Sequence, residues 1–368
     1  MRMLSKKICV CLLTGVMMLV PMNVFAEAKE VILSNTIYTW MKIIKKSGLI
    51  LGIILSFSLL FTSCVSKKTE DILYKESTSK NSKSKISPEK KYISFTMTKE
   101  EDNHLNMYTY TYNLKEEKIV NRVKLDYNAQ YPLAVYSSFD DSVYYSYRDD
   151  QDCDQLWRID LKSKNKECLT KSLFAINYII PLKEKVYVAA VKRGERAIGL
   201  FEYSQKKLTR ISKNKDDFIW KLNVNPDINK VAYNTYSQSE LDRNMEEGDG
   251  SSGIGINTIN VLDIESDQIK KVGTTPKGYI TSVGLDSDEN IYYNLGGFYK
   301  IGEENGDIYE EFTNLDIYDL VYINDNELYY LDSNEQLIKY NRVNKQSQVI
   351  YSVGNEEAAI NNAIILYK

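Results

Sequence analysis

The stretch Ser142-Val-Tyr-Tyr-Ser146 is a short apolar and aromatic run that recurs in varied form along the chain. Five related runs begin at Lys91, Lys185, Lys230, Asn290 and Glu327. Each is rich in β-branched residues and tyrosine, which favour β-strands. Successive runs are about 37 to 60 residues apart, which brackets the ~40–45-residue period of a four-stranded propeller blade. The repeat therefore predicts an all-β fold, a six-bladed β-propeller.

The second repeat shows how four strands make one blade. From the axis outward we place its strands at residues 131–137, 142–147, 155–161 and 166–170. In most repeats an Asx residue follows the third strand, where its side chain can bond its own backbone and start a turn. These residues are Asn113, Asp160, Asp263 and Asn341, with Ser204 and Gly302 near the same place in the remaining repeats.

The first repeat lacks an innermost strand, and the chain ends in Ala363-Ile-Ile-Leu-Tyr367, which has no blade of its own. Placing this terminal strand beside Tyr92–Met97 completes the first blade from the other end of the chain. Such a closure removes the open sheet edges that a linear stack of sheets would expose. We therefore expect a ring closed by the C-terminal strand rather than a seventh, partial blade.

Two export-like segments precede the propeller. Residues 1–40 form a signal-like extension with an apolar run at Ile8–Val20, and Met41 begins a second segment with an apolar run at Leu49–Phe61. Both runs are about 13 residues long, shorter than the ~20 residues that a helix needs to cross a bilayer. They indicate signal cores. We expect translation to start at Met41, and a working, uncleaved first segment is the alternative.

The second segment, residues 41–64, ends in Thr62-Ser-Cys64 and resembles a bacterial lipobox, although Phe61 stands where Leu is usual. The resemblance implies that Cys64 is lipidated and that the chain is anchored in the cell membrane, facing outside the cytoplasm, because two acyl chains hold a protein stably. A plain signal or an uncleaved anchor is the alternative. Residues 65–89 are rich in Ser and Lys, which predicts a flexible linker. Residues 90–368 form the propeller domain.

Composition narrows the classes of function. The 47 Lys and Arg residues nearly balance the 50 Asp and Glu residues, so nucleic-acid binding is not expected. His104 is the only histidine, which excludes a multi-histidine metal site and makes any Ser-His-Asp site depend on that residue. Cys153 and Cys168 fall too far apart along the predicted strands for a disulfide. We expect two unpaired thiols.

Loops between the second and third strands of every blade emerge on one face of a propeller. Four of them are long or charged here, at residues 99–104, 148–154, 192–196 and 236–255. Because loops on a rigid scaffold often carry binding residues, we predict a binding rim on this face. Its candidate residues are His104, Tyr147, Asp149, Asp150, Asp152, Asp154, Arg193, Arg196, Tyr236, Asp242 and Glu246.

Two of these loops have a simpler interpretation. Asp149, Asp152 and Asp154 could coordinate Ca²⁺ through carboxylate oxygens, but the glycine and distal glutamate of an EF-hand are missing, so a solvated acidic turn is expected. The acidic, glycine-containing insertion at residues 236–255 is typical of a mobile surface loop, with partner contact as the alternative. No cofactor is expected.

The repeats Val143-Tyr-Tyr145 and Leu156-Trp-Arg-Ile-Asp160, followed by a Lys-rich hairpin, are similar to those of TolB-like six-bladed propellers. The resemblance spans about residues 90–368 and implies a fold and a tendency to bind partners. We therefore expect a monomeric, non-enzymatic, membrane-anchored lipoprotein whose propeller binds an extracytoplasmic protein, peptide or glycan. The alternatives are a propeller enzyme that acts on a polysaccharide or lactone through channel carboxylates, and a structural subunit of an envelope complex.

Overall fold

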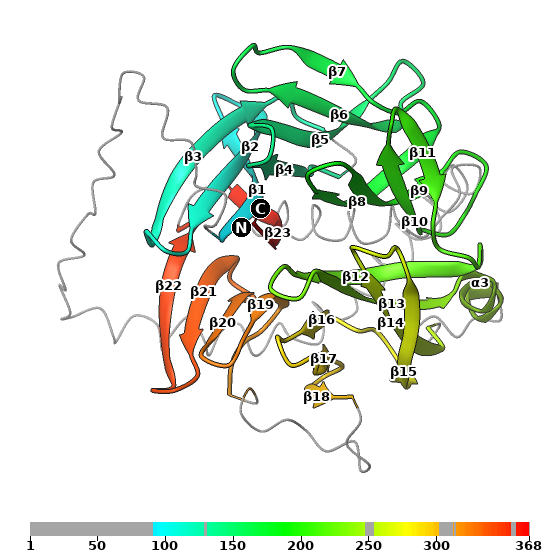
Figure 1. The fold of residues 1–368 in the computed structure, drawn as a ribbon, viewed down its shortest axis with the longest axis vertical. Helices are drawn as coiled ribbons and strands as arrows, with labels where there is room; N and C mark the ends of the chain where they lie inside the picture. The colour runs from blue at the N-terminus through cyan, green and yellow to red at the C-terminus, as the bar shows by residue number, and fades with distance from the viewer. Residues whose placement is uncertain are drawn as a thin grey trace, which may run out of the picture. The chain divides into compact units, whose positions relative to one another are not determined.

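The computed structural model describes residues 91–128, 131–246, 254–301, 312, 314–354 and 358–367. These residues form an all-β propeller of six sheets arranged in a ring (Figure 1), as the repeat predicts. The two signal-like segments, Cys64 and the linker lie outside the described residues. Among the residues described, no helix has the length and apolar character that a membrane crossing requires.

Each blade is an antiparallel sheet whose strands follow one another from the axis outward. Blade 1 contains β23 (Ala358–Leu366), β1 (Tyr92–Glu101), β2 (His104–Asn113) and β3 (Lys118–Leu125). Blade 2 contains β4 (Ala134–Ser137), β5 (Ser142–Arg148), β6 (Asp154–Asp160) and β7 (Lys166–Cys168). Blade 3 contains β8 (Leu173–Pro181), β9 (Val186–Lys192), β10 (Gly199–Ser204) and β11 (Lys207–Arg210).

The second half of the ring has the same order. Blade 4 contains β12 (Asp217–Asn225), β13 (Lys230–Ser237), β14 (Ile256–Asp263) and β15 (Ile269–Lys277). Blade 5 contains β16 (Ser282–Leu285), β17 (Ile291–Asn294) and β18 (Phe298–Lys300), and residues 302–311, which follow it, are not described. Blade 6 contains β19 (Asp319–Ile323), β20 (Glu327–Leu331), β21 (Gln336–Asn341) and β22 (Gln346–Ser352).

The C-terminal strand closes the ring, as expected. Strand β23 lies antiparallel to β1, with a register that runs from Tyr92 opposite Leu366 to Lys99 opposite Ala358. Ile365 and Leu366 are at most 1% exposed, so closure buries apolar side chains as well as sheet edges. The first and last parts of the propeller domain thus share one blade.

Second strands of the blades are buried on both faces, because each sheet is covered by a neighbouring blade on either side. This explains their continuous apolar sequence, as in β5 and β20. Several tyrosines in these strands place the ring in the core and the hydroxyl at a carboxylate near the strand end. The hydroxyl of Tyr144 donates to Asp140 at 2.9 Å, and that of Tyr292 donates to Asp286 at 2.9 Å.

The predicted Asx turns are confirmed. Carboxylate or amide oxygens of Asn113, Asp160, Asp263 and Asn341 each accept hydrogen bonds from the backbone two and three residues ahead. Ser204 does not start such a turn; Gln205 and Lys206 have φ angles of 47° and 61° instead, as in a tight hairpin. Gly302 lies outside the described residues.

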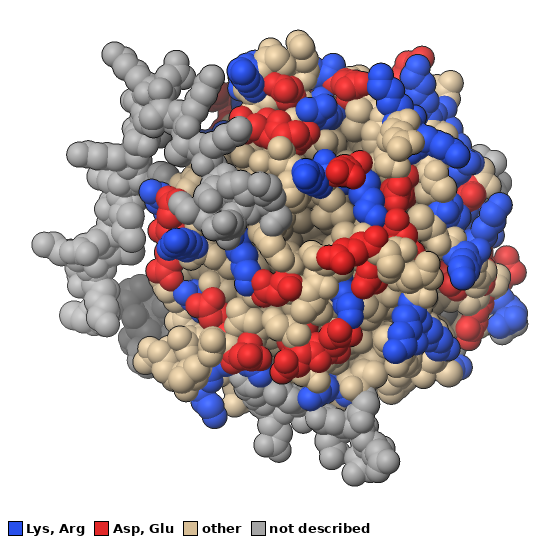
Figure 2. All heavy atoms as spheres, viewed as in Figure 1, with Lys and Arg blue, Asp and Glu red and all other residues tan. Residues whose placement is uncertain are grey.

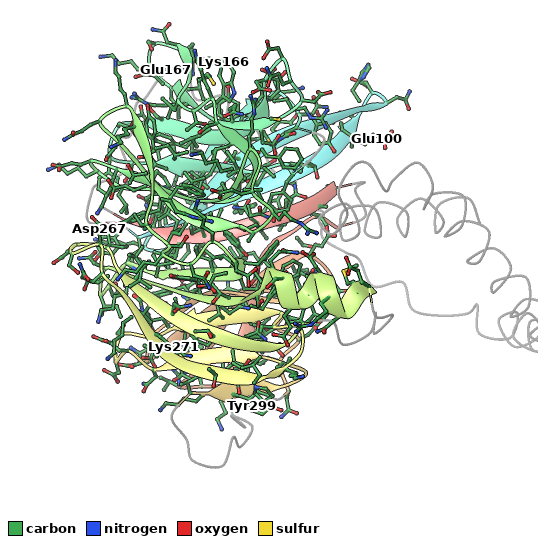
Figure 3. The ribbon with its side chains drawn as sticks, turned by 90° about the vertical axis from the view of Figure 1, so that its right-hand side faces the viewer. Glu100, Lys166, Glu167, Asp267, Lys271 and Tyr299 are labelled. Carbon is green, nitrogen blue, oxygen red and sulfur yellow. The ribbon has the colours of Figure 1, made fainter. Side chains whose placement is uncertain are left out.

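Two opposite faces of the ring can be distinguished (Figure 3). The turn face carries the turns from first to second and from third to fourth strands, such as residues 226–229 and the turn of Asp267. The loop face carries the connections from second to third strands and those between blades, including Glu100 at the tip of β1 and helix α3 (Gln238–Glu246). Figure 1 looks onto the turn face.

Two expectations for the loop face are wrong. Residues 99–104 are not a loop, because β1 and β2 extend to Glu101 and His104 and leave only Asp102 and Asn103, at φ angles of 54° and 62°, to make the turn. The insertion is not simply a mobile loop, because its first part forms helix α3 (Gln238–Glu246). Its residues 247–253 are not described.

Candidate functional site

The rim residues predicted on blades 2 and 3 are brought together around Asp149. Its carboxylate accepts backbone N–H groups of Gln151 at 2.9 Å and Cys153 at 3.1 Å, and it pairs with the guanidinium of Arg193. Burial raises the pKa of Asp149, but these hydrogen bonds and the Arg193 charge outweigh it and hold the pKa below its usual value. This pair joins two neighbouring blades.

Asp154 lies at the start of β6 and is 0% exposed. Its Oδ1 atom accepts a hydrogen bond from the Asn128 side chain at 2.9 Å, and its Oδ2 atom has no hydrogen-bond partner among the described residues. Burial raises the pKa of this carboxyl from 3.8 to about 6. Asp154 is therefore a buried, weakly acidic group beneath the rim and not a surface ligand.

The possible Ca²⁺ ligands do not converge. Asp149 faces Arg193, Asp152 pairs with Arg148 at 3.2 Å, and Asp154 bonds Asn128. No group of three His, Cys, Asp or Glu side chains within the described part of the chain is placed to hold a metal ion. The two thiols of this blade, Cys153 and Cys168, are both free, as expected, and Cys168 lies opposite Trp157.

Helix α3 begins at a capping motif that the sequence contains but that our prediction overlooked. Ser237 precedes the helix, and its hydroxyl accepts the backbone N–H of Glu240 at 3.0 Å, as in a capping box. Asp216 accepts the backbone N–H of Ser239 at 2.9 Å and ties the helix to blade 4. The spacing Ser237-Gln-Ser-Glu240 was the available signal.

The remaining rim residues differ in accessibility. Arg196 and Asp242 meet in an ion pair of 2.8 Å between blade 3 and helix α3. Tyr236 is 3% exposed and stacks on Phe218 with 4.9 Å between ring centroids. Tyr147 is half-buried, with its ring against Trp157. The exposed candidates are His104, Asp150, Asp152, Arg196 and Glu246.

A second group of residues, which the sequence did not predict, lies at the loop-face end of the channel. We name it the mouth cluster: Tyr131, Tyr178, Lys221, Tyr318 and Asp319. These residues come from blades 2, 3, 4 and 6 and interact electrostatically with one another. Tyr131, Tyr178, Lys221 and Asp319 keep some accessible surface although protein atoms surround them densely, as expected of channel-lining side chains.

Lys221 and Asp319 form the centre of the mouth cluster. The Lys221 ammonium lies 3.2 Å from a carboxylate oxygen of Asp319 and 5.6 Å from the Tyr318 ring centroid. Burial lowers the pKa of Lys221, but the negative charge of Asp319 raises it to a net value above the usual one. Burial also raises the pKa of Tyr131 and Tyr178, so both hydroxyls keep their protons at neutral pH.

Irregular strand pairing shapes this mouth. Four innermost strands have register shifts against their neighbours, which leave an extra residue on the inner strand. Such bulges redirect side chains and are common beside binding sites. The extra residues are Phe174 and Asn177 on β8, Trp220 or Lys221 on β12, Val321 on β19 and Asn361 on β23.

Buried amides hold the bulge of β12 in place. The backbone N–H of Lys221 donates to the Asn234 side chain at 2.8 Å, and Asn234 donates to Asn257 at 2.8 Å. Asn257 in turn donates to the carbonyl of Gly278 at 2.9 Å, beside Tyr279. A fully bonded buried network of this kind fixes the geometry of the groups it connects.

The other end of the channel is bridged. Lys91 of blade 1 pairs at 2.5 Å with Asp227 of the opposite blade 4, and its ammonium donates to the hydroxyl of Tyr322 at 2.8 Å. Tyr322 also donates to Asp227. Figure 2 looks onto this turn face and shows acidic and basic side chains around a central hollow. Lys91 and Asp227 thus link opposite blades on this face.

Exposed apolar side chains gather on the loop face. Within the described ranges, six of the eight large apolar side chains that are at least 40% exposed lie on it. The six are Leu105, Phe174, Met245, Ile256, Tyr279 and Tyr318; Val343 and Val349 lie elsewhere.

Comparisons with known proteins return solved structures of low sequence identity. A chain of a nidogen/laminin complex is 8% identical with a TM-score of 0.47, over 75% of this chain and 98% of that chain. TolB from Acinetobacter baumannii is 13% identical with a TM-score of 0.48, over 75% of this chain and 67% of that chain. The extracellular domain of a one component system from B. thetaiotaomicron is 14% identical with a TM-score of 0.38, over 67% of this chain and 31% of that chain.

No protein-family model and no curated protein sequence matches the chain. The protein is therefore classified by its own strand order and closure, as a six-bladed β-propeller.

Proposed function

We propose that this protein is a lipid-anchored, extracytoplasmic propeller that binds a protein, peptide or glycan through its loop face. The observation that carries the proposal is that, among the described residues, six of the eight exposed large apolar side chains lie on that face, and one of them, Tyr318, belongs to the mouth cluster. Aromatic groups beside hydrogen-bonding groups are typical of recognition surfaces. On the turn face, the Lys91 and Asp227 pair links opposite blades.

The proposed location rests on the sequence alone. Thr62-Ser-Cys64 follows a basic and apolar segment, in the order expected of a lipoprotein signal. Replacement of Cys64 with Ala should abolish palmitate labelling and either release the protein from membranes or leave its precursor uncleaved. Unaltered labelling of the Cys64→Ala variant would refute the anchor without affecting the proposal of a binding face.

Photo-crosslinking from the two faces tests the binding proposal. A photoreactive phenylalanine analogue is placed at Tyr279 or Tyr318 on the loop face, or at Val343 on the turn face, of the full chain in its own membrane. All three side chains are at least 41% exposed, so substitution should not disturb the core. Discrete adducts should form from the two loop-face positions and not from Val343. Adducts from Val343 alone, or none from the loop face, would contradict the proposal.

An enzyme is the second candidate, and one observation favours it. Asp319 is a channel carboxylate whose pKa is raised by burial, and a raised pKa is a property of general acids. Lys221 lies beside it and could support an acid or base role. If the enzyme proposal is correct, turnover of a polysaccharide or lactone will be lost in the Asp319→Asn variant, and loop-face binding without turnover will contradict it.

A further inference from the structure

We propose that the mouth cluster, together with Trp220 and Tyr279, binds a neutral saccharide. This inference rests on the proposed function, because it gives the loop face a specific class of ligand. It is carried by four properties of the mouth: its accessible aromatic rings, its mixture of hydrogen-bond donors and acceptors, its balanced charge and its irregular strand edges.

Aromatic rings on the loop-face side of the mouth are accessible. Tyr318 is 58% exposed and Tyr279 is 41% exposed. Trp220 lies against Tyr279, with 6.1 Å between ring centroids and an angle of 63° between the planes. A saccharide ring has a face of C–H groups, and these slightly positive hydrogens pack well on the negative face of an aromatic ring. The rings therefore provide stacking surfaces at the entrance.

Polar groups inside the mouth suit hydroxyl groups, each of which is both donor and acceptor. The hydroxyl of Tyr131 donates to the carbonyl of Asn361 at 3.3 Å and keeps acceptor capacity. Tyr178 forms a hydrogen bond with the backbone of Leu222. Lys221 has further N–H groups besides the one directed at Asp319. The mouth cluster thus offers both donors and acceptors.

Charge favours a neutral ligand. The mouth cluster holds one cation and one anion, Lys221 and Asp319, and they pair with each other at 3.2 Å. An anionic ligand would have to displace Asp319 from Lys221 and leave a half-buried carboxylate without its partner, which is unfavourable. A cationic ligand would have to displace Lys221 from Asp319 and leave the ammonium without its partner. Hydroxyl groups can bond both partners without separating them.

Strand geometry disfavours an extended peptide. A peptide that adds as a strand needs a regular, unpaired sheet edge. The inner edges of β8, β12, β19 and β23 are interrupted by bulges at the mouth, and bulges are one way in which sheet edges avoid such pairing. Compact rings held by side chains are therefore the better fit. The Lys91 and Asp227 pair spans the ring at the far, turn-face end.

Calorimetric titration of the purified full-length protein tests this inference. The probes are chitotetraose, maltotetraose and cellotetraose, with N-acetyl-tetra-alanine amide as a neutral peptide. At least one tetrasaccharide should bind, and the Tyr318→Ala variant should lose at least about tenfold in affinity, or ~1.4 kcal/mol. Val343→Ala, which changes an exposed residue that is 75% accessible on the turn face, should bind as the native protein does.

Tryptophan fluorescence provides a second readout. Trp220 lies in the proposed site, whereas Trp157 is in the third strand of blade 2. The same tetrasaccharide should change the emission of the native protein and of a Trp157→Phe variant, but not that of a Trp220→Phe variant. An emission change that persists without Trp220 would place the saccharide elsewhere and overturn the inference.

The outcomes separate this inference from the proposed function. Failure of all three tetrasaccharides to bind at up to about 10 mM, binding of the peptide alone, or equal binding by Tyr318→Ala would each overturn the saccharide assignment. If photo-crosslinks still form from the loop face, the binding proposal stands and only the ligand class is wrong. If neither crosslinks nor saccharide binding are found, both proposals fail.

Discussion

The turn face and the loop face are opposite ends of the same six sheets, yet they differ in almost every property. The turn face has short Asx turns and an ion pair that links opposite blades, Lys91 with Asp227. The loop face has connections of unequal length, a helix, bulged inner strands and six exposed apolar side chains. The turn face therefore joins opposite blades across the ring, whereas the loop face presents most of the exposed apolar side chains described.

Deleting residues 364–368 tests the closure on which both faces depend, and it should have the largest effect. Ile364, Ile365 and Leu366 are 6%, 0% and 1% exposed, and each buried side chain contributes about 1.5–3 kcal/mol. The sum approaches the ~5–15 kcal/mol that stabilises a typical domain. We expect loss of the cooperative thermal transition in circular dichroism.

A matched pair of point variants makes the closure test sharper. Ile365→Ala, in the closing strand, should cost about 2–5 kcal/mol, whereas Val349→Ala, at a site that is 51% exposed on an outer strand, should change stability by less than ~0.5 kcal/mol. Equal melting temperatures for the two variants would show that β23 does not close the ring.

Asp154 gives the loop-face side a pH dependence. Its pKa is raised from 3.8 to about 6 in the folded protein, so between these values the folded state holds more protons than the unfolded state. Stability should therefore fall as pH rises through this window, by on the order of 3 kcal/mol. Urea unfolding at pH 4 to 7 should show the fall in the native protein and not in Asp154→Asn. A parallel profile for the two proteins would contradict the assignment.

The turn-face bridge should have a smaller effect. Asp227→Asn removes the charge that Lys91 and Tyr322 share, and both partners of the ion pair are partly exposed, at 32% and 23%. We expect a loss of about 1 kcal/mol in unfolding free energy, with loop-face crosslinking unchanged. Loss of crosslinking at native-like stability would show that the two faces are not independent.

The smallest expected effect is local to helix α3 (Gln238–Glu246). Ser237→Ala removes the hydroxyl that caps Glu240, which should weaken the helix by about 1 kcal/mol. Amide exchange should become faster within residues 238–246 while the global melt changes little. Ser239→Ala is not a suitable control, because Ser239 also bonds Asp216. Val349→Ala, an exposed change on β22, provides a better one.

Much of the fold could be predicted because its signals are local. Tyrosine-rich second strands, Asx turns such as Asp160 and the unpaired terminal strand are all readable from short stretches. Helix α3 was missed because its acidic and glycine-containing neighbourhood suggested a loop, although the Ser237 to Glu240 spacing indicated a helix start.

The mouth cluster could not be predicted, because its residues are distant in the sequence. Lys221 and Asp319 are 98 positions apart. Bulges decide which residues of an inner strand face the channel, and the alternation of apolar and polar residues along a strand does not reveal where bulges lie. For the predicted rim, the sequence located the loops but not which of their side chains are exposed. Asp154 and Tyr236 lie in the expected loops or at their edges, but both side chains are buried.

Backbone hydrogen exchange of the full chain, with and without a partner captured through the loop face, tests the division between the two faces most directly. We predict slower exchange on binding in residues 174–178, 218–222 and 318–322, where inner strands reach the mouth, and unchanged exchange in the turns at residues 226–229 and 264–268. Protection confined to those turns, with the mouth unaffected, would contradict this division.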